Sequence, residues 1–245
     1  MIILGIETAT ESLSTALSVN DKMYERSKES RTSHCELLAG FISELTDEAG
    51  ITPKEINCVS VSTGPGSFTG LRIGIATAMG LAYGLNINAC GISTLMGLAY
   101  GAGKSADPGT FVCPVIDAKR SETYTALYKT TDDVPQTIVE PLALPVSRLA
   151  DMLGKRDEKI LITGPAADKF KDILTESLGD SIEFVSPELA NPSAKTIAEL
   201  GLRIFRSTGG ANPALLEPVY LRRSDAEILR DSKKNNSDSC SDNRD

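Results

Sequence analysis

Continuous apolar runs and helix-spaced apolar stripes alternate along most of the chain. The first run, Ile2 to Ile6, is rich in β-branched residues, as expected for a strand buried on both faces. Polar residues 7–12 predict a turn, and residues 13–19 and 22–28 predict two more strands joined at a hairpin signal, Asn20-Asp21. The chain is therefore predicted to open as a β-meander whose first turn carries an acid and several hydroxyls.

Helical spacing follows this meander. Ser33 and Glu36 have the spacing of a capping box, and residues 37–45 carry one continuous apolar stripe. Thr52-Pro53 predicts another helix start, because proline is favoured at the first helical position. Residues 58–62 then predict a strand.

A glycine-rich stretch, residues 64–70, leads into a helix predicted from Leu71 to about Tyr83. Small residues at four-residue spacing form two rows on this helix: Gly70, Gly74 and Ala78, and then Ala76, Gly80 and Gly84. Each glycine inside a helix costs about 1 kcal/mol relative to alanine. Because small residues let another backbone approach closely, we expect this helix to pack tightly against a neighbour.

A second strand-led unit begins after a linker-like break at residues 101–109. Further elements are predicted as strands at 87–92, 111–117, 122–129, 159–163 and 182–185, and as helices after Ser93, after Ser147, from about Ala167 and after Ser193. Two halves that each open with a strand, a polar turn and a hairpin indicate a duplicated α/β unit with a cleft between the halves. We assign residues 1–107 to the first domain, with 212–230 packing back on it, and 108–211 to the second. The polar, apolar-poor residues 231–245 predict a disordered tail.

Charge and composition limit the classes of function that the chain can have. The 245 residues carry 25 Lys and Arg against 33 Asp and Glu, a formal charge of −8, which argues against an autonomous nucleic-acid binder but allows a local basic patch. The single histidine, His34, excludes most histidine-based catalytic and metal sites. Five irregularly spaced cysteines are typical of reduced core residues, so we expect a cytoplasmic protein. No run approaches the roughly 18–20 apolar residues of a membrane span, and acidic Glu7 argues against a signal peptide.

Two polar segments of the first half could approach a phosphate or its Mg²⁺. The candidate anion- or nucleotide-binding residues in these segments are Glu7, Thr8, Thr10, Gly64, Gly66 and Ser67. A glycine-rich loop at a helix start can present backbone N–H groups to an anion, although residues 64–74 match neither a Walker loop nor a nucleophile elbow. The alternatives are a turn satisfied by its own hydroxyls and a loop that only packs a helix.

Two other polar clusters are weaker candidates for a functional site. His34 and Cys35 are adjacent, so on a helix they point about 100° apart and do not pair as base and nucleophile. Residues 117–124 form a polar turn in the second half, which is either an anion site or a charged hairpin.

Read together, residues 3–10, 64–74, 117–124 and 218–222 resemble the bacterial tRNA threonylcarbamoyladenosine biosynthesis family TsaB, also called YeaZ. The resemblance implies the two-domain α/β fold of actin, sugar kinases and Hsp70-type ATPases. It implies a non-catalytic scaffold for threonylcarbamoylation of adenosine 37 in tRNAs that read ANN codons. It also implies a TsaD-type catalytic paralogue and a TsaE-type ATPase as partners, a homodimer in isolation, and tRNA contact only within the complex.

The same resemblance implies a partner interface on residues 34–49 and 71–83. The interface residues expected from it are His34, Leu38, Phe41, Leu71, Gly74, Ile75, Ala78 and Tyr83. ATP or ADP with Mg²⁺ is expected, if at all, at the interface with partners.

Departures from the family pattern favour a scaffold without catalysis or bound metal. Leu38 stands where the catalytic paralogues' H-x-E-x-H metal motif has its second histidine. Glu7 stands where the fold more often has Asp, Lys119 replaces a common Arg, and Gly164-Pro165 replaces an acidic turn. Two alternatives stay open: a weak ATP-dependent phosphotransferase using Glu7, Thr8 and Thr10, and a peptidase using Cys35 or a metal at His34.

Overall fold

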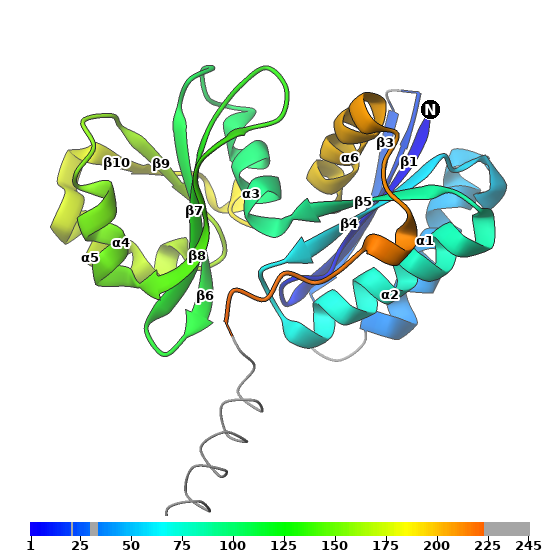
Figure 1. Ribbon diagram of the computed structural model, residues 1–245, viewed down its shortest axis with the longest axis horizontal. Helices are drawn as coiled ribbons and strands as arrows, with labels where there is room; N and C mark the ends of the chain where they lie inside the picture. The colour runs from blue at the N-terminus through cyan, green and yellow to red at the C-terminus, as the bar shows by residue number, and fades with distance from the viewer. Residues whose placement is uncertain (21, 30–33, 223–245) are drawn as a thin grey trace, which may run out of the picture.

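Two five-stranded mixed sheets, each covered by helices on both faces, form the molecule (Figure 1). The computed structural model describes residues 1–20, 22–29 and 34–222, without the side chains of residues 34 and 35. The first sheet has the order β3-β2-β1-β4-β5 and the second has the order β10-β9-β6-β7-β8. The predicted actin-like, duplicated α/β fold is confirmed. The predicted tail, residues 231–245, and the predicted cap Ser33 lie outside the described residues.

The first sheet grows from the apolar opening run. β1 pairs antiparallel with β2 and parallel with β4, and five of its six residues are buried. Leu4 and Ile6 face one side of the sheet and Ile3 faces the other, as the two-residue period of a strand requires. The strands are β1 Ile2–Glu7, β2 Ser12–Val19, β3 Lys22–Glu29, β4 Cys58–Gly64 and β5 Asn88–Ser93.

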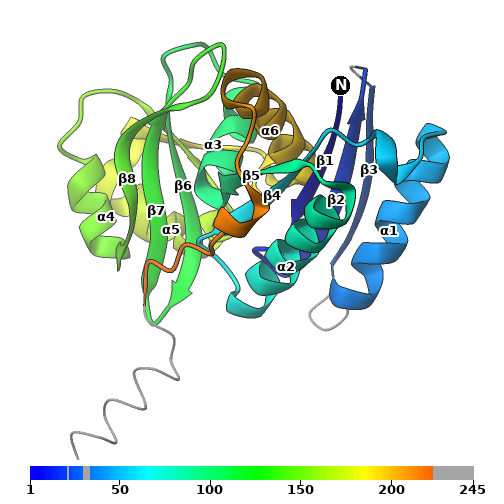
Figure 2. The same ribbon diagram turned by 45° about the vertical axis from the view of Figure 1, so that its right-hand side comes forward.

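Helices α1 (His34–Ala49) and α2 (Phe68–Leu85) cover one face of this sheet, and α6 (Ala194–Thr208) covers the other (Figure 2). Close packing on the α6 side depends on two glycines. A Cβ at Gly5 would overlap the Ala194 carbonyl oxygen, and a Cβ at Gly201 would overlap Ser60. The helix therefore lies almost on the backbone of β1 and β4.

The second sheet repeats the arrangement. Its strands are β6 Phe111–Lys119, β7 Glu122–Lys129, β8 Gln136–Pro145, β9 Ile160–Thr163 and β10 Ile182–Phe184. Helices α4 (Val146–Leu153) and α5 (Ala167–Leu178) share one apolar core with it, and α3 (Thr94–Gly103) packs on its other face. Because α3 also contacts α6, the two helices form a shared layer between the sheets.

The shared layer crosses the domain boundaries assigned from sequence. Residues 194–208 were assigned to the second domain, but α6 packs on β1, β2 and β4 of the first sheet. Conversely, α3 precedes the boundary at 107, yet its buried residues join the core of β6 and β7. After α6, a short turn at Pro213–Leu215 contacts α2 and β5, and residues 216–222 run on as a strap toward β6 (Figures 1 and 2).

Three expectations about single elements fail. Residues 136–145 form β8, for which the sequence predicted no strand, and its side chains are mostly half-buried. Thr52-Pro53 starts only a three-residue 3-10 turn, Pro53–Glu55. Finally, α2 is long and apolar enough to cross a membrane by length and composition, with a mean hydropathy of 1.2, although no such run was expected. A core helix passes the same test, and α2 packs on β4.

Candidate functional site

The glycine-rich loop before α2 closes directly onto the turn after β1. The Ser67 amide donates a hydrogen bond to the Ala9 carbonyl oxygen at 2.7 Å. A Cβ at Gly66 would overlap that same carbonyl, and a Cβ at Gly70 would overlap the Thr8 carbonyl oxygen. The two segments that sequence analysis singled out are therefore brought together, and glycine is required for their approach.

The inner row of small residues on α2 serves this contact. A Cβ at Gly74 would overlap the Thr8 hydroxyl, and Ala78 is fully buried. The expected close approach of another backbone is present, but the neighbour is the β1 turn of the same chain. The prediction that Gly74 and Ala78 belong to a surface for another protein is wrong for this row.

Glu7 lies at the centre of the junction and is completely buried. Its Oε1 accepts hydrogen bonds from the Ala9 amide at 2.6 Å and the Ser62 hydroxyl at 3.1 Å, while its Oε2 has no hydrogen-bond partner among the described residues. Burial raises the pKa of Glu7 to about 7, and the hydrogen bonds from Ala9 and Ser62 only partly offset it. The carboxyl group therefore titrates near neutral pH, so a large share of it is uncharged there.

Of the neighbouring candidates, Thr8 is enclosed like Glu7, whereas Thr10 is half-buried. Thr8 is fully buried, and its hydroxyl has no hydrogen-bond partner in the part of the chain that the structure describes. The Thr10 hydroxyl accepts from the Ser12 amide at 3.3 Å, which makes it part of the turn itself. Gly64 has a φ of 110°, a backbone conformation suited to glycine, and lies against Val219 of the strap.

This junction does not fit a nucleotide with Mg²⁺. Glu7 and Thr8 have no exposed surface from which to reach a ligand. The Ser67 amide is bonded to Ala9, and the Ser67 hydroxyl accepts from the Gly70 amide at 3.2 Å. The Ser67 and Gly70 amides are thus bonded within the chain itself, and we derive no step through a nucleotide at these residues.

The corresponding turn of the second half is a charged hairpin. Residues 119–121 have consecutive φ values of 66°, 52° and 61°. Asp117 accepts from the Lys119 amide at 2.8 Å and from the Lys169 ammonium at 2.7 Å. Partial burial alone would raise the pKa of Asp117, but the hydrogen bonds and charges of Lys169 and Lys119 lower it below its usual value.

The residues expected at a partner interface divide by burial. Those buried in the chain's own core are Leu38, Leu71, Gly74, Ile75 and Ala78, and they form no surface as they stand. They point inward because the apolar stripes of α1 and α2 cover the first sheet. Phe41 is half-buried, Tyr83 is 55% exposed, and the side chain of His34 lies outside the described residues.

The outer row of small residues is open. Ala76, Gly80 and Gly84 are exposed, and a Cβ added at Gly80 or Gly84 would meet none of the described residues within 4 Å. On α1, Gly40 is open in the same way. We call the surface of Gly40, Ala76, Gly80, Tyr83 and Gly84 the open helical face.

Comparisons with known proteins match the chain to proteins of tRNA threonylcarbamoyladenosine synthesis. A family model described as TsaD, tRNA N6-adenosine threonylcarbamoyltransferase, matches residues 27–230. The Bacillus subtilis (strain 168) tRNA threonylcarbamoyladenosine biosynthesis protein TsaB is 28% identical over 93% of this chain and 96% of its own length. The Escherichia coli (strain K12) TsaB is 28% identical over 91% and 96%. The chain belongs to the TsaB/YeaZ family.

Solved structures match the fold of this TsaB/YeaZ family member. A Pseudomonas aeruginosa protein described as similar to peptidase YEAZ is 25% identical, with a TM-score of 0.79 over 90% of this chain and 99% of that one. A structure described as YeaZ from Pseudomonas aeruginosa gives the same TM-score and coverage at 24% identity.

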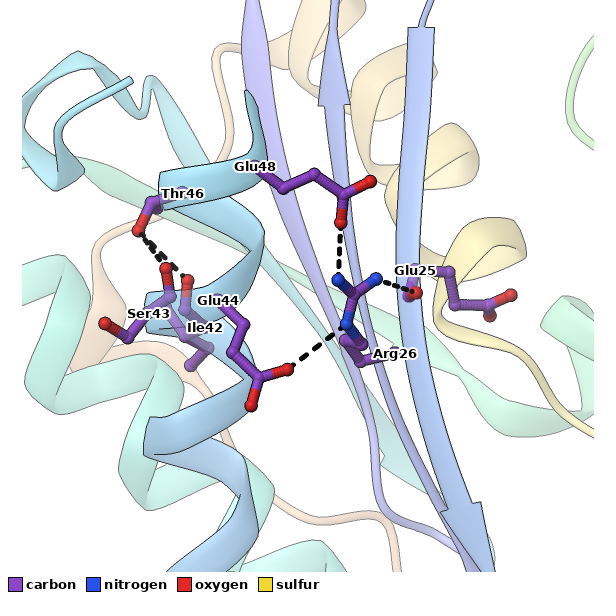
Figure 3. A network of polar contacts seen from close by, with 7 residues as sticks. All are labelled: Glu25, Arg26, Ile42, Ser43, Glu44, Thr46 and Glu48. Atoms are coloured by element: carbon purple, nitrogen blue, oxygen red, sulfur yellow. Dashed lines mark hydrogen bonds and ion pairs between the residues drawn. The ribbon is translucent and has the colours of Figure 1, made fainter. Parts of the chain in front are cut away.

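Two polar features of this TsaB/YeaZ chain escaped sequence analysis. Ser62, within β4, supports Glu7 from a strand 55 residues away, and only the parallel pairing of β1 with β4 brings them together. Arg26 on β3 bridges to Glu44 at 3.2 Å and also to Glu48, both on α1 (Figure 3). The acids lie at four-residue spacing on one helical face, a signal that identifies a salt-bridge face but not its partner.

Two open cavities of this TsaB/YeaZ chain, of about 470 and 330 Å³, lie beside the shared layer. Tyr100, Lys104 and Arg203 line both of them. Neither is lined by a residue of the Glu7 junction.

Proposed function

We propose that this chain acts in tRNA threonylcarbamoyladenosine biosynthesis as a non-catalytic subunit that docks a TsaD-type paralogue through its open helical face. We infer the pathway from the TsaB relatives, whose names include threonylcarbamoyladenosine biosynthesis. In isolation the same face pairs two copies of the chain, and the assembled complex recruits a TsaE-type ATPase and contacts tRNA.

The observation that carries the proposal is the contrast between the two rows of α2. The inner row is filled by Thr8 of the same chain. The outer row exposes Gly80 inside the helix and Gly84 in its last turn, and a Cβ at either would meet none of the described residues within 4 Å. A glycine inside a helix is destabilising by about 0.5–1 kcal/mol relative to alanine. Close approach of a second protein's helix gives the outer glycines a function, since small residues allow backbones to come near each other.

The Arg26 bridges support docking by fixing one side of this surface. They join α1 to the edge strand β3, and Arg26 also donates to the Glu25 carbonyl oxygen at 3.0 Å (Figure 3). Exposed ion pairs add little stability, but two acids on one arginine restrict the helix position. The partner therefore meets a preformed surface.

Replacement of the chain in cells tests the proposal. Gly80→Arg places a long charged side chain on the open helical face, where its Cβ meets nothing, so the chain should fold normally. In cells depleted of the native protein, we expect the wild type to restore threonylcarbamoyladenosine in bulk tRNA and Gly80→Arg to leave it at the depleted level. Nucleoside analysis of hydrolysed tRNA measures both.

Ser177→Arg is the matched control, because Ser177 is an exposed small residue on α5, on the far side of the second sheet. It should restore the nucleoside fully. Full restoration of the nucleoside by Gly80→Arg would rule out docking through the open helical face. An unchanged level of the nucleoside after depletion of the native protein would rule out the pathway assignment.

A further inference from the structure

A second exposed surface lies where the strap passes the start of α2. The rings of Phe68 and Tyr220 lie with centroids 5.1 Å apart and planes inclined by 30°. The Arg72 guanidinium lies over the Phe68 ring, 3.8 Å from its centroid, and its Nε donates to the Tyr220 hydroxyl at 3.1 Å. We call these three residues the aromatic platform. Phe68 and Tyr220 remain 42% and 44% exposed.

The platform is held in place by contacts on both sides of it. The Val219 amide donates to the Thr63 carbonyl oxygen at 2.7 Å, which fixes the strap to the first sheet. Arg222 donates to the Ala118 carbonyl oxygen at 3.0 Å, which fixes it to the hairpin of the second sheet. Figures 1 and 2 show the strap crossing between the two halves at this point. The rings are therefore presented in one arrangement.

Cationic side chains gather beside the platform. Arg72 is part of it, and Arg222 lies two residues beyond Tyr220 and contacts the hairpin that carries Lys119 and Arg120. Asp117 of that hairpin binds Lys169 as well. Asp117 and Glu122 pair with three of these five cations: Lys119 at 3.5 Å, Lys169 at 2.7 Å and Arg222 at 3.6 Å.

We propose that the aromatic platform stacks on an unpaired base of RNA while the neighbouring cations contact its phosphates. Aromatic rings and arginine planes are the surfaces on which proteins stack single-stranded bases, and such stacking tolerates any base because each has a π-face. The formal charge of −8 disfavours RNA contact over the chain as a whole, so the stacking residues select where the RNA binds. Within the proposed function, on which this inference rests, the RNA is a loop of the substrate tRNA.

Photo-crosslinking to the purified full-length chain tests the platform. The probe is a short RNA hairpin with 4-thiouridine in its unpaired loop, at low salt, and mass spectrometry locates the crosslinked peptide. We expect crosslinks at Phe68 or Tyr220, competition by the unlabelled hairpin, and little competition by a fully paired duplex of equal length. Phe68→Leu with Tyr220→Leu should lower the crosslink yield about tenfold, the loss expected from removing a stacking contact.

Two variants separate stacking from charge and from misfolding. Arg72→Gln leaves both rings in place and should lower the yield several-fold, with an unchanged thermal unfolding midpoint. Arg148→Gln removes a charge from exposed Arg148 on α4 and should change nothing. Absence of crosslinks, crosslinks elsewhere, or equal yields from wild type and the double variant would each overturn the proposal. Loss of TsaD association by the double variant with an unchanged crosslink yield would identify a protein interface instead.

The two proposals fail separately. A chain that restores threonylcarbamoyladenosine in depleted cells but gives no platform crosslink loses only the RNA contact. A chain that crosslinks through the platform but whose depletion leaves the nucleoside unchanged loses the pathway assignment.

Discussion

Glu7 places a buried carboxyl group at the junction between the β1 turn and the glycine-rich loop. It is fully buried, its Oε1 takes two hydrogen bonds, and its Oε2 takes none. An unpaired buried carboxylate oxygen is costly when it is charged, so the group keeps its proton up to neutral pH. At this turn Glu7 holds Ala9 and Ser62 together rather than facing solvent.

Stability should therefore fall as pH rises through the range between the two pKa values of Glu7. The folded pKa, about 7, lies above the usual glutamate pKa of 4.5, so the folded state binds the proton more tightly across this interval. Ionising buried Glu7 lowers the free energy of unfolding. This loss is absent below pH 4.5, is complete above pH 7, and amounts to about 3 kcal/mol. Glu7→Gln cannot ionise, so the variant should be more stable than wild type at pH 8 and close to it at pH 5.

Urea unfolding of both proteins at the two pH values measures this difference. Taking the difference between variant and wild type cancels the other titrating groups. A Glu7→Gln variant that is less stable than wild type at pH 8 would show that Glu7 is charged and satisfied in the fold.

At the scale of the element, α2 carries two rows of small residues with opposite roles. The inner row allows Thr8 to lie against the helix, and the outer row faces away from the described part of the chain. Periodicity in the sequence identified both rows and their spacing. It could not tell which row is buried, because glycine and alanine occupy both and carry no difference in hydrophobicity to orient the helix.

Alanine substitutions in the two rows should have opposite signs. In Gly70→Ala the new Cβ overlaps the Thr8 backbone oxygen, which cannot rotate away, so we expect a loss of several kcal/mol. In Gly80→Ala the Cβ meets nothing, so removal of a helix glycine should stabilise the chain by about 0.5–1 kcal/mol. Chemical unfolding of the monomer at low concentration measures both. Equal effects of the two substitutions would contradict this orientation of α2.

Other elements show where prediction from sequence stops. The opening strands and the helix after the glycine loop follow from local spacing, and they are confirmed. Strand β8 was missed because its sequence contains prolines and no clean alternation, and β7 defines it by pairing with it. The contact of Ser62 with Glu7 and the stack of Phe68 on Tyr220 join segments 55 and 152 residues apart, so only the folded chain reveals them.

For the whole molecule, the two halves are joined by more than the shared layer. Arg203 on α6 donates to Asp133 at 2.7 Å and to the Tyr100 hydroxyl at 3.2 Å, which ties the first sheet's helix to the loop before β8. Arg222 makes the corresponding tie from the strap to the β6–β7 hairpin. A chain held at both sides, with its junction filled by its own residues, is suited to present surfaces rather than to open and close on a nucleotide.

The most direct test is association of the purified chain with its TsaD-type paralogue, measured by sedimentation velocity. Wild type and Ser177→Arg should form a heterodimer with equal affinity, and Gly80→Arg should remain unassociated while showing an unchanged unfolding midpoint. A heterodimer of undiminished affinity with Gly80→Arg would contradict the claim that this chain works by docking another protein on the outer row of α2.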